Sequence, residues 1–116
     1  MLDPTYGTVF DKATMLERLM EDEQLAASIL KGFLKDTPGR IEALQGHLAA
    51  GDARSADLQA HTIKGAAGYV GGNALHTVAH ELERATRAGD LEAGRACMAP
   101  LEREFRRLKE AIENDR

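Results

Sequence analysis

Short breaks of glycine and aspartate divide this chain into segments in which apolar residues recur every three or four positions. The clearest breaks are AAGD (Ala49–Asp52) and AGD (Ala88–Asp90), where glycine suits the end of one helix and aspartate the start of the next. The spacing of three and four is that of one face of an α-helix. Because the connections are only two to four residues long, successive helices should lie antiparallel and adjacent.

The sequence predicts one short helix followed by four longer helices. Asp11 and Asp22 are expected to cap the first two helices. The third helix is expected over residues 53–69, the fourth is expected to begin at Asn73, and the last is expected over residues 91–112. The apolar stripe of the second helix is expected to include Leu25, Ile29, Phe33, Ile41, Leu44 and Leu48, with a kink or break at Pro38, and a kink in the last helix is expected at Pro100. The sequence therefore predicts an all-α, antiparallel up-down four-helix bundle with a short N-terminal capping helix, over residues 9–114, after a flexible tail at residues 1–8.

Composition narrows the class of protein. The 116 residues suit one domain, and the absence of tryptophan with only 4% aromatic residues favours helices. A net charge of −4 argues against nucleic-acid binding, and no apolar run approaches the length of a membrane span. No secretion signal is expected, and the single Cys97 indicates a reduced, cytoplasmic setting.

The stretch AHTIKGAAGYVGG (Ala60–Gly72) is unusual because it places glycines inside a predicted helix. On a helical wheel the core stripe is Ala56, Ala60, Ile63, Ala67 and Val70. His61, Lys64, Gly65 and Gly68 follow the i, i+3, i+4, i+7 spacing on roughly the opposite side. Glycine in mid-helix costs roughly 1 kcal/mol relative to alanine, so a solvent-facing stripe of glycines needs a reason.

That reason is access to the histidine. Because the glycines have no Cβ atoms, the imidazole extends beyond the surrounding helix surface, and another protein can approach the backbone closely. The neutral imidazole is nucleophilic near neutral pH, and Lys64, one turn on, supplies a mobile cation for a doubly charged anion. This pattern is typical of a site for a phosphorylated histidine.

The same stretch closely resembles the signature of the histidine-containing phosphotransfer (Hpt) domains of bacterial phosphorelays, roughly A-H-x-[LI]-K-G-x-x-x-x-[ILV]-G. The resemblance extends over residues 9–112 and includes VFD, EDEQLAASILKGFLKDTPGRIEALQGHLAAGD and ALHTVAHELERATRAGDLEA. It implies a four-helix bundle in which His61 is phosphorylated, Lys64 neutralises the phosphoryl group and Gly65 leaves room for it. Gly71 matches the glycine that ends the helix in this family, and Gly68 falls where a small residue is common.

The resemblance also points to the next helix. Some relatives use a glutamine there to hydrogen-bond the active histidine, and Glu83 occupies the corresponding position. A carboxylate can accept the ring N–H of His61 but would also repel an incoming phosphate, so both outcomes are open. Arg87, one turn on, matches a basic residue that some relatives use near the site.

The expected role is that of a carrier without ATP-dependent kinase activity, since the chain has no P-loop and no acidic Mg²⁺ cluster. His61 would accept a phosphoryl group from a receiver-domain phospho-aspartate and pass it to another receiver aspartate. The partners would be response-regulator receiver domains and a hybrid sensor histidine kinase. The receiver would supply Mg²⁺, so the chain would need no cofactor or metal of its own and would act as a monomer.

Two other kinds of protein remain open at this stage. One is a helical adaptor that binds receiver domains without carrying phosphate, and the other is a small metal-binding bundle that uses His76 and His80. Leu58 lies one turn before His61 and is a candidate docking residue. Leu30 and Leu34 would either extend that apolar patch or pack against the first helix.

Overall fold

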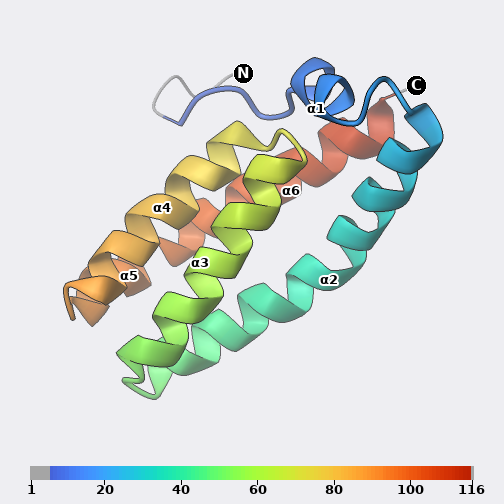
Figure 1. The fold of residues 1–116 in the computed structure, drawn as a ribbon. Helices are drawn as coiled ribbons and strands as arrows, with labels where there is room; N and C mark the ends of the chain where they lie inside the picture. Colours follow the sequence, from blue (N-terminus) through green and yellow to red (C-terminus); the bar gives the residue numbers. More distant parts are fainter. Residues whose placement is uncertain (1–5, 116) are drawn as a thin grey trace.

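A computed structural model of the protein describes residues 6–115, which form an all-helical bundle (Figure 1). Its helices are α1 Lys12–Arg18, α2 Glu23–Ala49, α3 Ala53–Tyr69, α4 Asn73–Arg87, α5 Leu91–Ala96 and α6 Met98–Asn114. The bundle consists of α2, α3, α4 and the consecutive pair α5 and α6, while α1 lies across one end. The predicted fold class is confirmed. None of the helices in this described part is long and apolar enough to cross a membrane.

Four aspartates start four of the helices. The side chains of Asp11, Asp22, Asp52 and Asp90 each accept a hydrogen bond of 3.0–3.1 Å from the backbone N–H three residues further on. An N-cap of this kind satisfies one of the N–H groups that a helix start leaves without a partner. The capping roles predicted for Asp11, Asp22 and Asp52 are confirmed, and α3 has the predicted bounds.

Of the kink or break predicted at Pro38, the break is wrong, because α2 continues through this residue as one helix of 27 residues. Its buried stripe is continuous and consists of Ala26, Leu30, Phe33, Thr37, Ile41, Leu44 and Leu48. Packing on both sides of Pro38 therefore outweighs the one hydrogen bond that proline cannot donate. The assumed break also misplaced the stripe: Leu25 is exposed, and Leu30 is buried.

The last predicted helix is divided in two, since α5 ends at Ala96 and α6 begins at Met98. Pro100 lies in the first turn of α6, where its missing N–H costs little, rather than at a kink in mid-helix. The apolar seam nevertheless continues across the junction, with Gly94, Met98, Leu101, Phe105 and Leu108 buried. The division at Cys97 thus leaves the predicted core face intact.

Contacts from α1 fix the end of α3. The backbone N–H of Asp11 donates to the carbonyl of Gly71 at 2.7 Å. Arg18 Nη1 donates to the carbonyls of Gly68 and Tyr69 at 3.1 and 3.2 Å. These carbonyls lie at the C-terminal end of α3 and just beyond it, where helices leave acceptors without intrahelical donors. The short leading helix therefore caps the helix that carries His61.

The tail predicted at residues 1–8 lies mostly outside the described residues. Within the described part, Tyr6 packs against the core and the Thr8 carbonyl accepts a hydrogen bond from Ala74 N–H at 2.8 Å. Residues 6–8 are thus in contact with the bundle, and flexibility at residues 1–5 stays a prediction.

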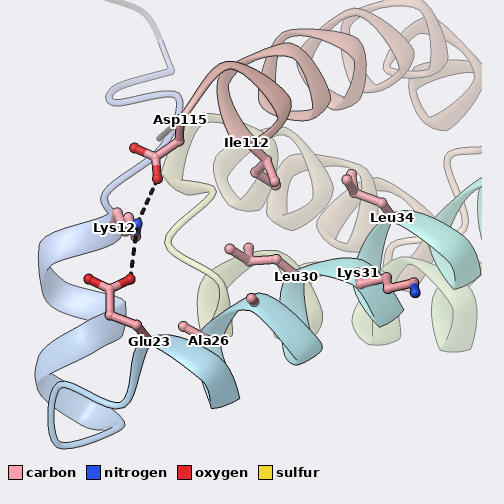
Figure 2. A pocket seen from close by; sticks show the side chains of 9 residues that line it. Lys12, Glu23, Ala26, Leu30, Lys31, Leu34, Ile112 and Asp115 are labelled. Atoms are coloured by element: carbon pink, nitrogen blue, oxygen red, sulfur yellow. Dashed lines mark hydrogen bonds and ion pairs between the residues drawn. The ribbon is translucent and has the colours of Figure 1, made fainter.

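A groove of about 350 Å³ lies between α1, α2 and the end of α6 (Figure 2). Lys12 Nζ bridges its rim, at 3.3 Å from Glu23 Oε1 and 2.6 Å from Asp115 Oδ2. Leu30, Leu34 and Ile112 line the groove. Leu30 and Leu34 therefore line a groove that they share with Lys12 of α1 and Ile112 of α6.

Candidate functional site

His61 projects from the outer face of α3. The core stripe predicted for this helix is buried throughout, which leaves the opposite side facing solvent. The His61 side chain is 64% exposed. The structure therefore places the imidazole where the helical wheel predicts it.

A buried carboxylate on α4 holds the inner nitrogen of this ring. Glu83 Oε2 lies 2.6 Å from His61 Nδ1, and the Glu83 side chain is only 2% exposed. A carboxylate can only accept here, so the neutral imidazole carries its proton on Nδ1 and leaves the Nε2 lone pair unprotonated. Within residues 6–115, Nε2 makes no hydrogen bond. The contact between Glu83 and His61 is therefore present, and repulsion of an incoming phosphate by this carboxylate stays a prediction.

The other Glu83 oxygen is held by Lys64. The Lys64 Nζ donates to Glu83 Oε1 at 2.6 Å, and the lysine side chain is 21% exposed. In this state the Lys64 ammonium is therefore paired with a buried carboxylate, and the mobile cation expected from the sequence stays a prediction. The sequence did not predict this pairing, because the spacing of α3 does not reveal which groups face it from α4.

Glu83 is an anion in this setting. Burial by itself would raise its pKa, but hydrogen bonds from Lys64 and His61 and the charges of Lys64 and Arg87 outweigh burial and lower it. A buried carboxylate remains charged only when it is paired and hydrogen-bonded in this way. The negative charge beside His61 Nδ1 is therefore a fixed feature of the site at neutral pH.

Arg87 and Asp57 complete the outer edge of the site. Arg87 Nη2 donates to Glu83 Oε2 at 3.0 Å, and its Nε lies 3.7 Å from Asp57 Oδ1. The Arg87 side chain is 66% exposed, so it covers the carboxylate from the solvent side. Sequence reasoning did not single out Asp57, although it lies one turn before His61 on the same helix face.

The three candidate glycines have different neighbours. A Cβ at Gly65 would meet no atom within 4 Å, so the space beside His61 is open. A Cβ at Gly68 would lie 3.0 Å from His76 Cδ2, which shows that the missing side chain accommodates that ring. Gly71 has φ of +78°, and a Cβ there would overlap the backbone carbonyl of Asp11. Gly65 thus opens the surface, whereas Gly68 and Gly71 serve packing.

Leu58 and His80 lie at the edges of the site. Leu58, one turn earlier on α3, is 62% exposed and provides an apolar contact surface. His80 on α4 is half-exposed, with Nδ1 3.8 Å from Glu83 Oε1.

His76 is partly buried, and burial together with the positive charges of Lys64 and His80 lowers its pKa. Among residues 6–115 no group of three or more His, Cys, Asp or Glu side chains is arranged to hold a metal ion.

The site consists of an exposed histidine in mid-helix on a small bundle, and a buried carboxylate holds its inner nitrogen. This arrangement is typical of a class of protein that carries a chemical group on an imidazole. Comparisons with known proteins give the same class. The family model described as "Hpt domain" matches residues 28–114. The crystal structure of histidine-containing phosphotransfer protein B (HptB) from Pseudomonas aeruginosa PAO1 is similar, with a TM-score of 0.80 and 30% identity over 95% of this chain and 99% of that one.

A comparison with curated proteins found no match. The family match nevertheless covers most of the chain, and the structural match covers almost all of it. The chain belongs to the Hpt domain family. It is a histidine phosphotransfer protein of a phosphorelay, in which Hpt domains interact with receiver domains and kinases.

Proposed function

We propose that His61 is the residue that carries the phosphoryl group, which it accepts from the phospho-aspartate of one receiver domain and passes to the aspartate of another. The observation that carries this proposal is the 2.6 Å contact between His61 Nδ1 and Glu83 Oε2. It directs the proton to Nδ1 and leaves Nε2 as a nucleophile on the exposed side of the ring.

The transfer step follows from this arrangement. The Nε2 lone pair attacks phosphorus, the N–P bond forms, and the bond between phosphorus and the aspartyl oxygen breaks, so that the aspartate leaves as a carboxylate. The ring keeps its Nδ1 proton and becomes positively charged. The Glu83 anion beside Nδ1 offsets that charge, which lowers the free energy of the phosphorylated ring. The reverse sequence delivers the group to the next receiver.

Lys64 supplies positive charge from this side of the complex. Its flexible stem allows the ammonium to leave Glu83 for a phosphoryl oxygen, since Lys64 lies within one helical turn of His61. Gly65 leaves the space that the phosphoryl group and the approaching receiver need. Arg87 keeps one cation on Glu83 throughout the reaction.

The receiver domain provides the remaining parts of the reaction. It brings the Mg²⁺ and the catalytic groups that act on the acyl phosphate, so the protein acts as a carrier without kinase activity or a cofactor of its own. Leu58 supplies apolar contact area for the docked receiver. A cytoplasmic monomer suits repeated exchange between receiver domains and a hybrid sensor kinase.

The proposal is tested by incubating the protein with a ³²P-labelled receiver domain and Mg²⁺. Acid-labile, alkali-stable label is expected on the wild type and on no part of His61→Gln. Lys64→Ala should keep the helical circular dichroism of the wild type and accept label roughly tenfold more slowly, because one charge interaction with the phosphoryl group is lost. Label on His61→Gln would contradict the proposal, and tight receiver binding without label would favour an adaptor.

A further inference from the structure

The two carboxylate oxygens of Glu83 accept different numbers of hydrogen bonds. Oε2 accepts from both His61 and Arg87, at 2.6 and 3.0 Å. Oε1 has one close donor, Lys64 Nζ at 2.6 Å. The next group is His80, whose Nδ1 stands 3.8 Å from Oε1, too far for a hydrogen bond.

A phosphoryl group on His61 would change this balance. It brings about two negative charges close to Lys64, and Lys64 is the donor that the proposed function assigns to it. When the ammonium turns outward, Oε1 loses the only close donor that it has within residues 6–115. A buried carboxylate oxygen left without a donor costs free energy comparable to a lost hydrogen bond or more.

His80 is the group in position to replace it. His80 lies one turn before Glu83 on α4, and its half-exposed ring stands beside the carboxylate. Arg87 is already bonded to Oε2, and His76 is packed against Gly68. Closing the present 3.8 Å to hydrogen-bond length requires a movement of about 1 Å.

We propose that His80 is a positioning residue, which takes the place of Lys64 on Glu83 when Lys64 moves to the phosphoryl group on His61. This inference rests on the function proposed above. The exchange keeps both Glu83 oxygens hydrogen-bonded in the phosphorylated state. It therefore holds Glu83 against His61 Nδ1 while Lys64 serves the phosphoryl group, and it favours phosphorylation of this protein over that of the receiver.

The test is the equilibrium between phosphorylated receiver and phosphorylated protein, measured with ³²P and Mg²⁺ for His80→Ala and His80→Asn. The Asn side-chain amide places an N–H donor near the position of Nδ1, so it is the conservative replacement. His80→Ala should shift the equilibrium toward the receiver by roughly three- to tenfold, the effect of one hydrogen bond. His80→Asn should return it to within about twofold of the wild type.

The same substitutions in a Lys64→Met background separate positioning from a general structural effect. Without the ammonium, His80 can occupy Oε1 in both states, so His80→Ala should then change the equilibrium less than about twofold. An equal shift in both backgrounds, no shift in either, or no recovery with Asn would overturn the role of His80. Absence of label on the wild-type protein would instead overturn the proposed function, and the inference with it.

Discussion

Glu83 organises the site at the scale of single residues. Its buried carboxylate fixes the His61 ring, holds Lys64 in the unphosphorylated state and is covered by Arg87. The sequence places His61, Lys64 and Gly65 on one exposed face, because helical periodicity alone determines that arrangement. It does not reveal which groups from α4 face them. The state of Lys64 therefore depends on a contact between helices that periodicity cannot predict.

The open space at Gly65 gives a prediction in which stability and function move in opposite directions. Gly65→Ala should raise the free energy of unfolding by up to about 1 kcal/mol, since alanine is the better helix former. A Cβ at this position meets no atom within 4 Å, so nothing in the protein opposes the gain. Phosphotransfer should become slower, because the methyl group would occupy space that the proposed function assigns to the phosphoryl group and the receiver. Urea denaturation and the labelled-receiver assay measure the two effects.

Gly46→Ala is the matched control for that experiment. Gly46 also lies on an exposed helix surface, on α2, and a Cβ there would likewise meet no atom within 4 Å. It should show the same stabilisation with an unchanged transfer rate. If Gly65→Ala transferred phosphate as fast as Gly46→Ala, the proposed role of Gly65 would be wrong.

At the scale of whole helices, packing outweighs local signals. Pro38 is a strong helix breaker by itself, yet the buried residues on either side of it form a single stripe along α2. Read without a break, the same sequence places Leu30 inside and Leu25 outside, as observed. Helix starts were easier to predict than the course of α2, because an aspartate cap such as Asp52 acts within one turn.

The junction of α1 with the end of α3 predicts a strong effect at Gly71. Gly71→Ala should lower the free energy of unfolding by about 2 kcal/mol or more, because alanine is disfavoured at positive φ. Its methyl group would also overlap the Asp11 carbonyl and displace α1. Thermal denaturation followed by circular dichroism measures the loss. A variant as stable as the wild type would contradict this account of how α1 is attached.

Asp52, the N-cap of α3, predicts that the free energy of unfolding depends on pH. Hydrogen bonds from the side chain and backbone of Ser55 lower the pKa of Asp52 below its usual value of 3.8. A carboxyl group with a lower pKa in the folded state stabilises the fold above the unfolded-state pKa, and this contribution disappears as the pH falls through the folded-state pKa. Asp52→Asn keeps a capping oxygen but does not titrate.

The unfolding free energy of Asp52→Asn should therefore fall less steeply than that of the wild type below about pH 4. Denaturant titrations at a series of pH values measure this slope. Asp36→Asn is the control for removal of one carboxylate, since Asp36 is exposed within α2 and caps no helix. Identical slopes for wild type and Asp52→Asn would show that protonation of Asp52 does not contribute to the loss of stability at low pH.

At the scale of the whole molecule, the bundle supports the helix that presents His61. The bundle keeps α3 packed along its core stripe, and α1 caps its end, so His61 is presented from the middle of a well-anchored helix. The fold class followed from periodicity and short breaks, whereas the division at Cys97 did not, because the apolar seam is the same with one helix or two.

The central claim is that Glu83 directs the phosphoryl group to the outer nitrogen of His61. The most direct measurement is NMR of ¹⁵N-histidine-labelled protein after phosphorylation by a receiver domain, which identifies the nitrogen bonded to phosphorus. We expect a phosphoramidate on Nε2 of His61, with Nδ1 still protonated beside Glu83. A phosphoryl group on Nδ1 of His61, or on His76 or His80, would contradict it.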